Sequence, residues 1–313
     1  MSINNRMISV AMATYNGAEY IIEQLDSIRR QTKSVDEVVI VDDCSKDETV
    51  SLVRAFNEKY PDLNIKLYEN EENLGYKKNF KKALSLCDGE ILFLCDQDDA
   101  WKENKVEVLC NIFETRPEVG LVSSAFVYLG GKEKSLYARK MKAGELVEVP
   151  VEDLIFHNIS QGCAMAMTKE IRDEFLEKFT EKLPHDWVLN VIAAMKKKCY
   201  YLNEYLFYYR IHDKNTIGLS DDLTLQKKRT LEIRTHDAKQ AVVVLDVIKE
   251  ANEIFYLEEA KLEEMRSFAI LHVENLEKKR FIGIFKQNFN KNYKKLKSFR
   301  GRIMDIIFVL NKL

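Results

Sequence analysis

The chain lacks the features that mark secreted and membrane-spanning proteins. Its six cysteines include no C-x-x-C pair, so nothing indicates a disulfide framework, and we expect all of them to be reduced. No stretch reaches the roughly 18 apolar residues that a membrane span needs. The N-terminus also lacks the hydrophobic core of a signal peptide. These absences predict a cytoplasmic protein that does not cross the membrane.

Glycine is scarce where many nucleotide-binding loops need it. The 11 glycines form neither a G-x-G-x-x-G nor a G-x-x-x-x-G-K-[ST] motif, which argues against a dinucleotide site of the common type and against a P-loop. Internal repeats and low-complexity blocks are absent as well. The composition is 46% hydrophobic and 31% charged, which is ordinary for a soluble chain with a sizeable core.

The charge is spread unevenly along the chain. The net charge is −2, but residues 278–313 hold eleven Lys or Arg against one acid, a net +10 that leaves −12 for the rest. Aromatic and aliphatic side chains are mixed with these cations, a pattern typical of an interfacial membrane anchor. A solvated helix that packs on the rest of the chain or on a second copy explains it equally well. No nucleic-acid-binding motif accompanies the charge, so we do not expect nucleic acid as a partner.

Short apolar runs alternate with helical patterns over the first 130 residues. The patterns predict strands at residues 7–13, 37–41, 65–68, 90–95 and 120–129, with helices at 18–31, 47–60, 76–86 and 101–114. Strands separated by helices form βαβ units with right-handed crossovers. The sequence therefore predicts an α/β fold with a mostly parallel, Rossmann-like sheet.

The pattern is looser after residue 131. We expect a short helix at 151–157, a strand at 162–167, helices at 169–179 and 186–195, and an aromatic-rich strand at 200–209. A polar stretch follows, and residues 223–276 are helix-forming. We therefore divide the chain near residue 219, into residues 1–218 and a helical, basic C-terminal region of residues 219–313.

Three carboxylates crowd into Asp96-Gln97-Asp98-Asp99, directly after an apolar run that predicts a buried strand. Ligands of open α/β sheets bind at the carboxyl ends of the strands. Crowded carboxylates repel one another, and a divalent cation that carries a phosphorylated ligand would offset the repulsion. The alternative is an acidic turn in which Asp98 or Asp99 caps the next helix.

Two further polar loops follow predicted strands at the same edge. Thr14, Tyr15 and Asn16 come after the first strand, and Asp42 and Asp43 come after the second. Three loops at one edge could build a single cleft. An ionised Asp only accepts hydrogen bonds, so Asp42 suits the N3–H of a pyrimidine. Turn and cap chemistry explains the same carboxylates without a ligand.

Four ordered segments resemble family 2 glycosyltransferases of the GT-A type, and most of all the rhamnosyltransferase-like branch. They are SVAMATYNG at 9–17, VDDCSKD at 41–47, NLGYKKN at 73–79 and DQDDAW at 96–101. The likeness covers roughly the first 215 residues. It implies a GT-A catalytic domain that moves a sugar from a nucleoside diphosphate-sugar, a dTDP- or UDP-sugar, to an acceptor hydroxyl with inversion, assisted by Mg²⁺ or Mn²⁺.

The resemblance also implies roles for individual residues. Thr14 and Asp42 would contact the nucleoside, and Tyr15, Asn16, Asp43, Lys78 and Asn79 would complete the donor site near the base or diphosphate. Asp98 would ligate the metal, while Asp96 would lie near the ribose or a metal-bound water. A cation held by oxygen ligands stabilises the charge of a departing diphosphate.

Asp186, in Pro184-His185-Asp186-Trp187, matches the later acidic motif of the family. An inverting displacement needs one base for the proton of the acceptor hydroxyl, and we assign that role to Asp186. Capping of the following helix is the alternative. His212, in a Y-R-x-H segment, would close over the diphosphate and metal, although a loop histidine bonded to water fits as well. Gln161-Gly162-Cys163 resembles an acceptor-side segment of the family.

The family context implies a lipid-linked or polysaccharide acceptor in bacterial surface-glycan synthesis. It places the protein at the inner face of the plasma membrane, with peripheral contact through residues 278–313, and leaves a homodimer open. A nucleotidyltransferase that makes a nucleotide-sugar is one alternative, although it would normally carry a glycine-rich phosphate loop with Arg and Lys after the first strand. A non-catalytic nucleotide-sugar-binding protein is the other.

Overall fold

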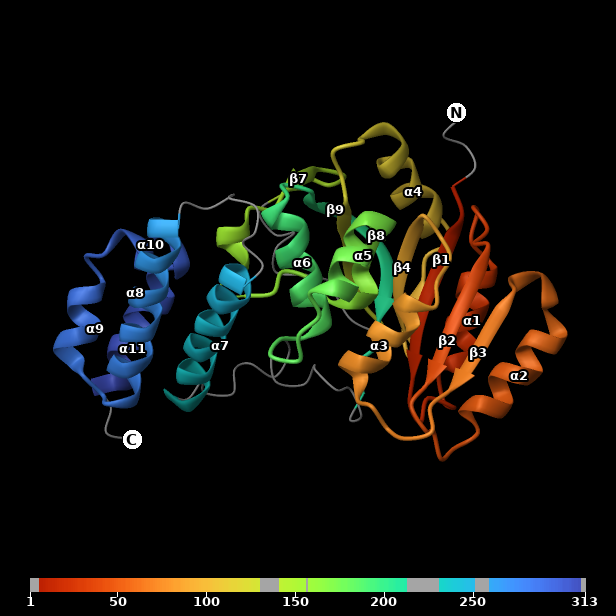
Figure 1. The fold of residues 1–313 in the computed structure, drawn as a ribbon, viewed down its shortest axis with the longest axis horizontal. Helices are drawn as coiled ribbons and strands as arrows, with labels where there is room; N and C mark the ends of the chain where they lie inside the picture. The colour runs from red at the N-terminus through yellow and green to blue at the C-terminus, as the bar shows by residue number, and fades with distance from the viewer. Residues whose placement is uncertain (1–5, 130–140, 156, 213–230, 251–258, 311–313) are drawn as a thin grey trace. The chain divides into compact units, whose positions relative to one another are not determined.

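The computed structural model describes residues 6–129, 141–155, 157–212, 231–250 and 259–310 (Figure 1). The chain divides into two compact units. Unit 1 comprises residues 1–149 and 159–211, and unit 2 comprises residues 150–158 and 212–313. The boundary predicted near residue 219 lies outside the described residues.

Unit 1 is built on one mixed sheet, which has nine strands among the described residues. They are β1 (Ile8–Thr14), β2 (Glu37–Asp42), β3 (Ile65–Glu69), β4 (Ile91–Asp96), β5 (Ala100–Trp101), β6 (Leu121–Tyr128), β7 (Leu146–Glu148), β8 (Met165–Thr168) and β9 (Cys199–Tyr209). The strand order is β3-β2-β1-β4-β8-β6-β9-β5, and β7 also pairs with β9. Strands β1 to β4 run parallel, as does the β6–β9 pair, whereas β8, β5 and β7 are antiparallel to their neighbours. The predicted α/β class is confirmed.

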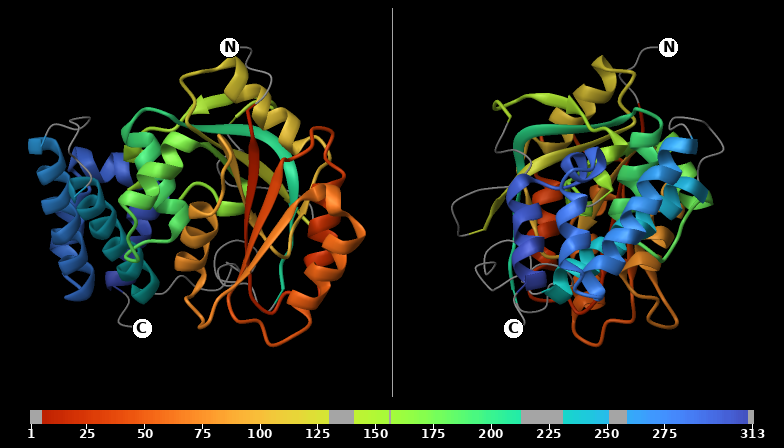
Figure 2. Two further views of the ribbon diagram at one scale, coloured as in Figure 1. Left: turned by 45° about the vertical axis from the view of Figure 1, so that its right-hand side comes forward. Right: turned by 90° about the vertical axis from the view of Figure 1, so that its left-hand side faces the viewer.

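Helices cover both faces of this sheet (Figures 1 and 2). They are α1 (Ile21–Arg29), α2 (Thr49–Lys59), α3 (Tyr76–Ser85), α4 (Lys105–Thr115), α5 (Lys169–Glu177) and α6 (His185–Met195). Strands β1, β2 and β4 are therefore buried on both faces and consist of nearly continuous apolar runs. Helix α1 shows the complementary pattern, since Ile21, Leu25 and Ile28 face the core.

The order of the connections reverses beside β1. The chain runs outward from β1 to β2 and β3 and then returns to β4 on the other side of β1. Because both crossovers are right-handed, the reversal moves the connecting helix to the opposite face. Figures 1 and 2 show α1 and α2 on one face and α3, α5 and α6 on the other. The carboxyl ends of β1 and β4 therefore flank a topological switch point, the usual ligand position in such sheets.

Tertiary pairing changes three elements that local patterns predicted. Ala100 and Trp101 form β5 against Tyr208 and Phe207, so α4 begins at Lys105 rather than at residue 101. Gly162–Ala164 is a 3-10 turn, and the strand predicted at 162–167 starts only at Met165. Val151–Leu154 is also a 3-10 turn rather than a longer helix. In the β5 case, pairing with β9 overrides the helical periodicity of the segment.

Unit 2 is helical in its described parts, as predicted for the C-terminal region. Its helices are α7 (Leu231–Glu250), α8 (Glu259–Glu277), α9 (Phe281–Gln287), α10 (Lys291–Leu296) and α11 (Phe299–Leu310). Ala238, Leu276, Ile284 and Val309 form a small apolar core. In the described parts of the chain, every helix is too short or too polar to cross a bilayer.

One buried carboxylate joins the helices of unit 2. Asp305 of α11 lies 2.6 Å from Nε of Arg234 on α7 and 2.7 Å from Nζ of Lys297, and it accepts a hydrogen bond from the Tyr293 hydroxyl. His272 Nε2 is 3.5 Å away. Burial opposes ionisation of Asp305, but these neighbours outweigh it and hold the pKa of the carboxyl below its usual value. We call this group the Asp305 cluster.

Candidate active site

Side-chain hydrogen bonds join the loops that follow β1 and β2. Thr14 Oγ1 donates to Asp42 Oδ1 over 2.8 Å, and the hydroxyl and backbone N–H of Ser45 also donate to the Asp42 carboxylate. Asn16, with a left-handed φ of 49°, donates its N–H to Ser45 Oγ and accepts from the N–H of Lys46. Both strand ends are thus fixed before any ligand binds.

The loop after β4 is tied to the same edge through Gln97. Its side chain accepts from the N–H of Tyr15 and donates to the Tyr15 carbonyl, both over 2.9 Å. Gly17 leaves room for this contact, because a Cβ on it would lie 2.1 Å from Gln97 Oε1 and would force the Gln97 side chain to shift. The three loops that sequence analysis assigned to one cleft therefore form one connected edge.

Asp43 and Asn79 contribute to the framework around this edge. Asp43 accepts hydrogen bonds from the N–H groups of Leu74 and Gly75 and from the amide of Asn70. Asn79 donates to the carbonyl of Val41 and accepts from Asn70. These bonds shape the 73–79 segment, and a direct contact with a donor remains a prediction for both residues.

Lys78 and Tyr15 are the more exposed members of the predicted donor site. Lys78 Nζ lies 3.1 Å from Glu181, and both side chains are solvent-exposed. An ion pair of this kind contributes little to stability. Tyr15 is 48% exposed. Both side chains are free to reorient toward a ligand, in contrast to the buried Thr14 and Asp42.

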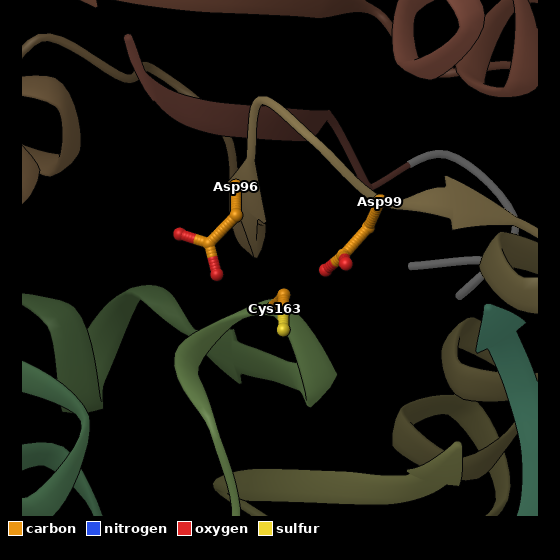
Figure 3. A group of neighbouring side chains, drawn as sticks. All are labelled: Asp96, Asp99 and Cys163. Atoms are coloured by element: carbon orange, nitrogen blue, oxygen red, sulfur yellow. The ribbon is translucent and has the colours of Figure 1, made fainter. Parts of the chain in front are cut away.

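The acidic segment forms the centre of the edge. Ligand atoms of Asp96, Asp99 and Cys163 lie within 4.8 Å of one another, and Figure 3 shows the two carboxylates on either side of the thiol. Burial, followed by the charge of Asp98, raises the pKa of Asp96 to about 7. The same two causes raise the pKa of Asp99 well above its usual value. The four-residue segment thus carries more negative charge than its surroundings stabilise.

The capping alternative for Asp98 and Asp99 is wrong. Helix α4 begins at Lys105 with Asn104 at its N-cap, and β5 separates it from the acidic segment. Asp99 instead is buried and accepts the backbone N–H of Arg210 over 3.0 Å. Arg210 also donates from Nε to the Asp98 carbonyl, which ties the end of β9 to this segment.

A buried lysine behind the acidic segment was missed by sequence analysis. Lys105 is fully buried, its Nζ donates to the Cys163 carbonyl over 2.6 Å, and it lies 4.0 Å from the ring centre of Trp101. Burial lowers its pKa to about 8, although nearby acidic groups oppose the shift. The available signal was its position in α4, where it shares the apolar face of Val106 and Leu109.

Asp186 lies in the first turn of α6 and is mostly buried. Pro184 occupies the N-cap position, so Asp186 is not the N-cap residue, although its carboxylate accepts the N–H of Trp187 in the first turn over 2.8 Å. Burial is the main cause of the raised pKa values of Asp96 and Tyr76, and the charge of Asp186 contributes to both. The start of α6 packs beside the turn that carries Cys163, since a Cβ on Gly162 would lie 2.8 Å from Nε2 of His185. His185 beside it stacks on Phe80 with ring centres 4.2 Å apart.

His212 remains a prediction as a metal ligand, because it belongs to unit 2 rather than to the unit that carries Asp98. The other donors suit a hard cation. Mg²⁺ and Mn²⁺ bind carboxylate oxygens, whereas burial raises the pKa of the Cys163 thiol and disfavours the thiolate that softer metals select. The residues present therefore fit the predicted divalent cation.

Comparison with known proteins identifies the family. The model of the family described as "Glycosyl transferase family 2" matches residues 9–175, more than half of the chain. The chain belongs to glycosyl transferase family 2. The matched region contains the three loops at the edge of the sheet and Cys163.

Named relatives agree with this membership. The family 2 chain is 29% identical over 233 residues to "dTDP-rhamnosyl transferase RfbG" of Shigella flexneri, covering 70% of this chain and 77% of that protein. It is also 29% identical over 218 residues to an uncharacterized glycosyltransferase of Nostoc, covering 66% of each chain.

Solved structures establish the GT-A fold. Staphylococcus aureus TarS in complex with UDP-GlcNAc matches with a TM-score of 0.63 at 19% identity, covering 97% of this chain and 81% of that one. The mannosyltransferase PcManGT of Pyrobaculum calidifontis, in complex with GDP-Man and Mn²⁺, matches with a TM-score of 0.50 at 21% identity, covering 99% and 89%. The predicted fold class is confirmed.

Proposed function

We propose that this family 2 protein is an inverting, metal-dependent glycosyltransferase of bacterial surface-glycan synthesis. It moves a sugar, with rhamnose favoured, from a dTDP- or UDP-sugar to a hydroxyl of a lipid-linked or polysaccharide acceptor at the inner face of the plasma membrane. The observation that supports the proposal is the group of Asp96, Asp99 and Cys163, whose ligand atoms lie within 4.8 Å of one another beside the carboxyl end of β4 in a chain of this family. The name of the RfbG relative supports the choice of dTDP-rhamnose.

The donor would lie across the ends of β1, β2 and β4. Asp42, fixed by Thr14 and Ser45, presents an acceptor for the N3–H of a pyrimidine. The side chains of Lys78 and Tyr15 can turn toward the diphosphate. Asp43 and Asn79 hold the 73–79 segment in place. Asp98 would hold Mg²⁺ or Mn²⁺, with Asp96 near the ribose or a metal-bound water, and the cation would stabilise the negative charge of the leaving diphosphate.

Asp186 would take the proton of the acceptor hydroxyl as that oxygen attacks the anomeric carbon opposite the leaving group. The start of α6 packs beside the turn that carries Cys163, since a Cβ on Gly162 would lie 2.8 Å from Nε2 of His185, and this supports a base on the same side as the acidic segment. Holding both partners in that geometry lowers the barrier by avoiding the entropy loss of their encounter.

Two variants test this assignment. Asp98→Asn should abolish transfer and weaken metal-dependent donor binding, whereas Asp186→Asn should lower turnover by about 10²–10⁴-fold, the range for general base catalysis, with donor affinity kept. Transfer from dTDP-rhamnose and from a panel of UDP-sugars gives the rate, and calorimetry with Mn²⁺ gives donor affinity. Asp62→Asn, an exposed carboxylate in a 3-10 turn, is the matched control. Full activity of both site variants would refute the assignment.

A nucleotidyltransferase is the less favoured function, since no glycine-rich, basic loop follows β1 and the family match points elsewhere. Release of pyrophosphate from a nucleoside triphosphate and a sugar phosphate would support it. A non-catalytic binding protein would show donor binding in calorimetry without transfer.

A further inference from the structure

An aromatic row lies exposed on α9 of unit 2 and on the turn that follows it. Phe281, Phe285 and Phe289 follow one another at intervals of four residues, with neighbouring ring centres 6.1 Å and 5.6 Å apart. Phe285 is 48% exposed and Phe289 is 74% exposed. The opposite side of α9 carries Ile284, which is buried in the core of unit 2. The row is therefore an outward surface and not part of that core.

A second apolar row lies on α11, which packs against α9. Phe299, Ile303, Ile307 and Leu310 fall on one helical face, and each is exposed. Val309 and Asp305 of the same helix point inward and are buried. Ile282 of α9, 67% exposed, adds another aliphatic side chain to the outward surface. We call the two rows and Ile282 the apolar rows of unit 2.

The charge around these rows is mostly positive. Exposed cations precede, interrupt and follow α9 and reach the start of α11: Lys278, Lys279, Arg280, Lys286, Lys291, Lys294 and Arg300. The sole acid of residues 278–313, Asp305, is buried and neutralised by Arg234 and Lys297. Lys278 and Arg280 pair with Glu274, and Lys291 pairs with Glu264, whereas Lys279, Lys286 and Arg300 have no acidic partner within salt-bridge distance in the described part of the chain.

We propose that the apolar rows of unit 2 dock on the surface of a lipid bilayer that contains anionic lipids. Exposed Phe, Ile and Leu side chains enter the boundary between headgroups and acyl chains, and the surrounding Lys and Arg side chains bind lipid phosphates. Long basic side chains suit this position because their stems can lie along apolar surface while their charges reach the headgroups.

Two other occupants fit these observations less well. A second copy docked on the same face would bring two regions of net charge +10 together, which like-charge repulsion opposes. A single-stranded nucleic acid stacks its bases on aromatic rings, but Ile282, Ile303, Ile307 and Leu310 offer no such platform. An anionic bilayer matches both the apolar and the basic components.

Vesicle co-sedimentation of the full chain tests the proposal. The protein should pellet with vesicles of equal parts phosphatidylglycerol and phosphatidylcholine at least about tenfold more strongly than with phosphatidylcholine alone, and added salt should weaken the binding. Phe285→Ala combined with Phe289→Ala should reduce binding about tenfold or more, and Lys279→Glu combined with Lys286→Glu should reduce it similarly. Leu271→Ala, whose side chain on α8 is also 48% exposed, is the matched control and should bind normally.

The exposed positions of Phe289 and Lys286 allow these changes without loss of core packing, and circular dichroism would confirm that each variant folds. Equal binding to both vesicle types would overturn the proposal. So would anionic-vesicle binding that is unaffected by the Phe substitutions, or dimerisation through this face without vesicle binding. Donor binding by unit 1 is a separate measurement, so failure here leaves the proposed transfer reaction untouched.

Discussion

Two buried groups of charged side chains, one in each unit, have opposite balances of charge. In unit 1, the buried cation Lys105 lies behind Asp96 and Asp99, whose pKa values are raised by burial and by the charge of Asp98. In the Asp305 cluster, one carboxylate faces Arg234 and Lys297, and its pKa is lowered. Surplus carboxylates at the strand ends are suited to receive a cation, whereas surplus cations around Asp305 complete a structural contact. The same residue type thus serves a site in one unit and a scaffold in the other.

The largest effect is expected from Asp305→Asn. The variant leaves Arg234 and Lys297 buried without a counter-charge, which should cost about 3–5 kcal/mol of unfolding free energy. Urea denaturation measures the loss. Glu232→Gln, at an exposed position of α7, should change stability by less than about 0.5 kcal/mol. Equal stability of the two variants would show that Asp305 has no structural role.

Metal binding should stabilise the protein through the acidic segment of unit 1 and not through the Asp305 cluster. Mn²⁺ at a hundredfold excess over its dissociation constant should stabilise the native protein by about 2.7 kcal/mol. The expected result is a rise in melting temperature for the unsubstituted protein and for Glu232→Gln, but none for Asp98→Asn. A persistent rise in Asp98→Asn would mean that the cation binds elsewhere.

Removal of the counter-cation in unit 1 should have a smaller effect. Lys105→Met loses the hydrogen bond to the Cys163 carbonyl and leaves that buried acceptor unsatisfied, at a cost of about 1–3 kcal/mol. The neighbouring Lys102→Met is the control, because Lys102 is only half-buried. Thermal denaturation at pH 7 compares the two, and a neutral Lys105→Met would show that the acidic segment needs no internal cation.

His185 gives the smallest effect, which depends on pH. Burial, with a contribution from Lys77, lowers its pKa to about 3. An unfolded histidine titrates near pH 6.5, so between about pH 6.5 and 3 the unfolded chain binds a proton that the native protein does not. The unfolding free energy should therefore fall as the pH falls, by up to about 1.4 kcal/mol per pH unit from this group.

His185→Phe should flatten that dependence, since Phe can also stack on Phe80. Urea denaturation at pH 7 and pH 5 should show a loss smaller by about 2 kcal/mol than in the unsubstituted protein. His236→Phe, at an exposed position, should keep the original slope. Identical slopes for both variants would show that His185 is not held neutral.

Local sequence patterns were sufficient to predict the strands whose carboxyl ends form the candidate site. Apolar runs ended by Thr14, Asp42 and Asp96 identify β1, β2 and β4, because strand periodicity and turn residues are local signals. The antiparallel insertion of β8 between β4 and β6 could not be predicted this way, since pairing partners depend on contacts far apart in the chain. The same limit concealed β5, whose partner Tyr208 lies more than 100 residues away.

The candidate site was only partly predictable for the same reason. The acidic segment and the two polar loops could be placed at one edge by topology alone. The assignment of Asp186 to the same site came from family resemblance, because the residues between it and Asp96 give no measure of their distance. The engagement of Asp43 with Leu74 and Gly75, and the burial of Lys105 under Trp101, depend on tertiary packing that composition does not encode.

The pairing of Gly17 with Gln97 limits how the donor preference of this protein could be re-engineered. Any side chain at residue 17 would collide with the amide of Gln97, and a shorter residue at 97 would release the backbone of Tyr15. If the loop after β1 were replaced by that of another enzyme, the residue that contacts it in the β4 loop of that enzyme would therefore have to be transplanted as well. Libraries that vary positions 17 and 97 together should yield folded, active clones that single-site libraries miss.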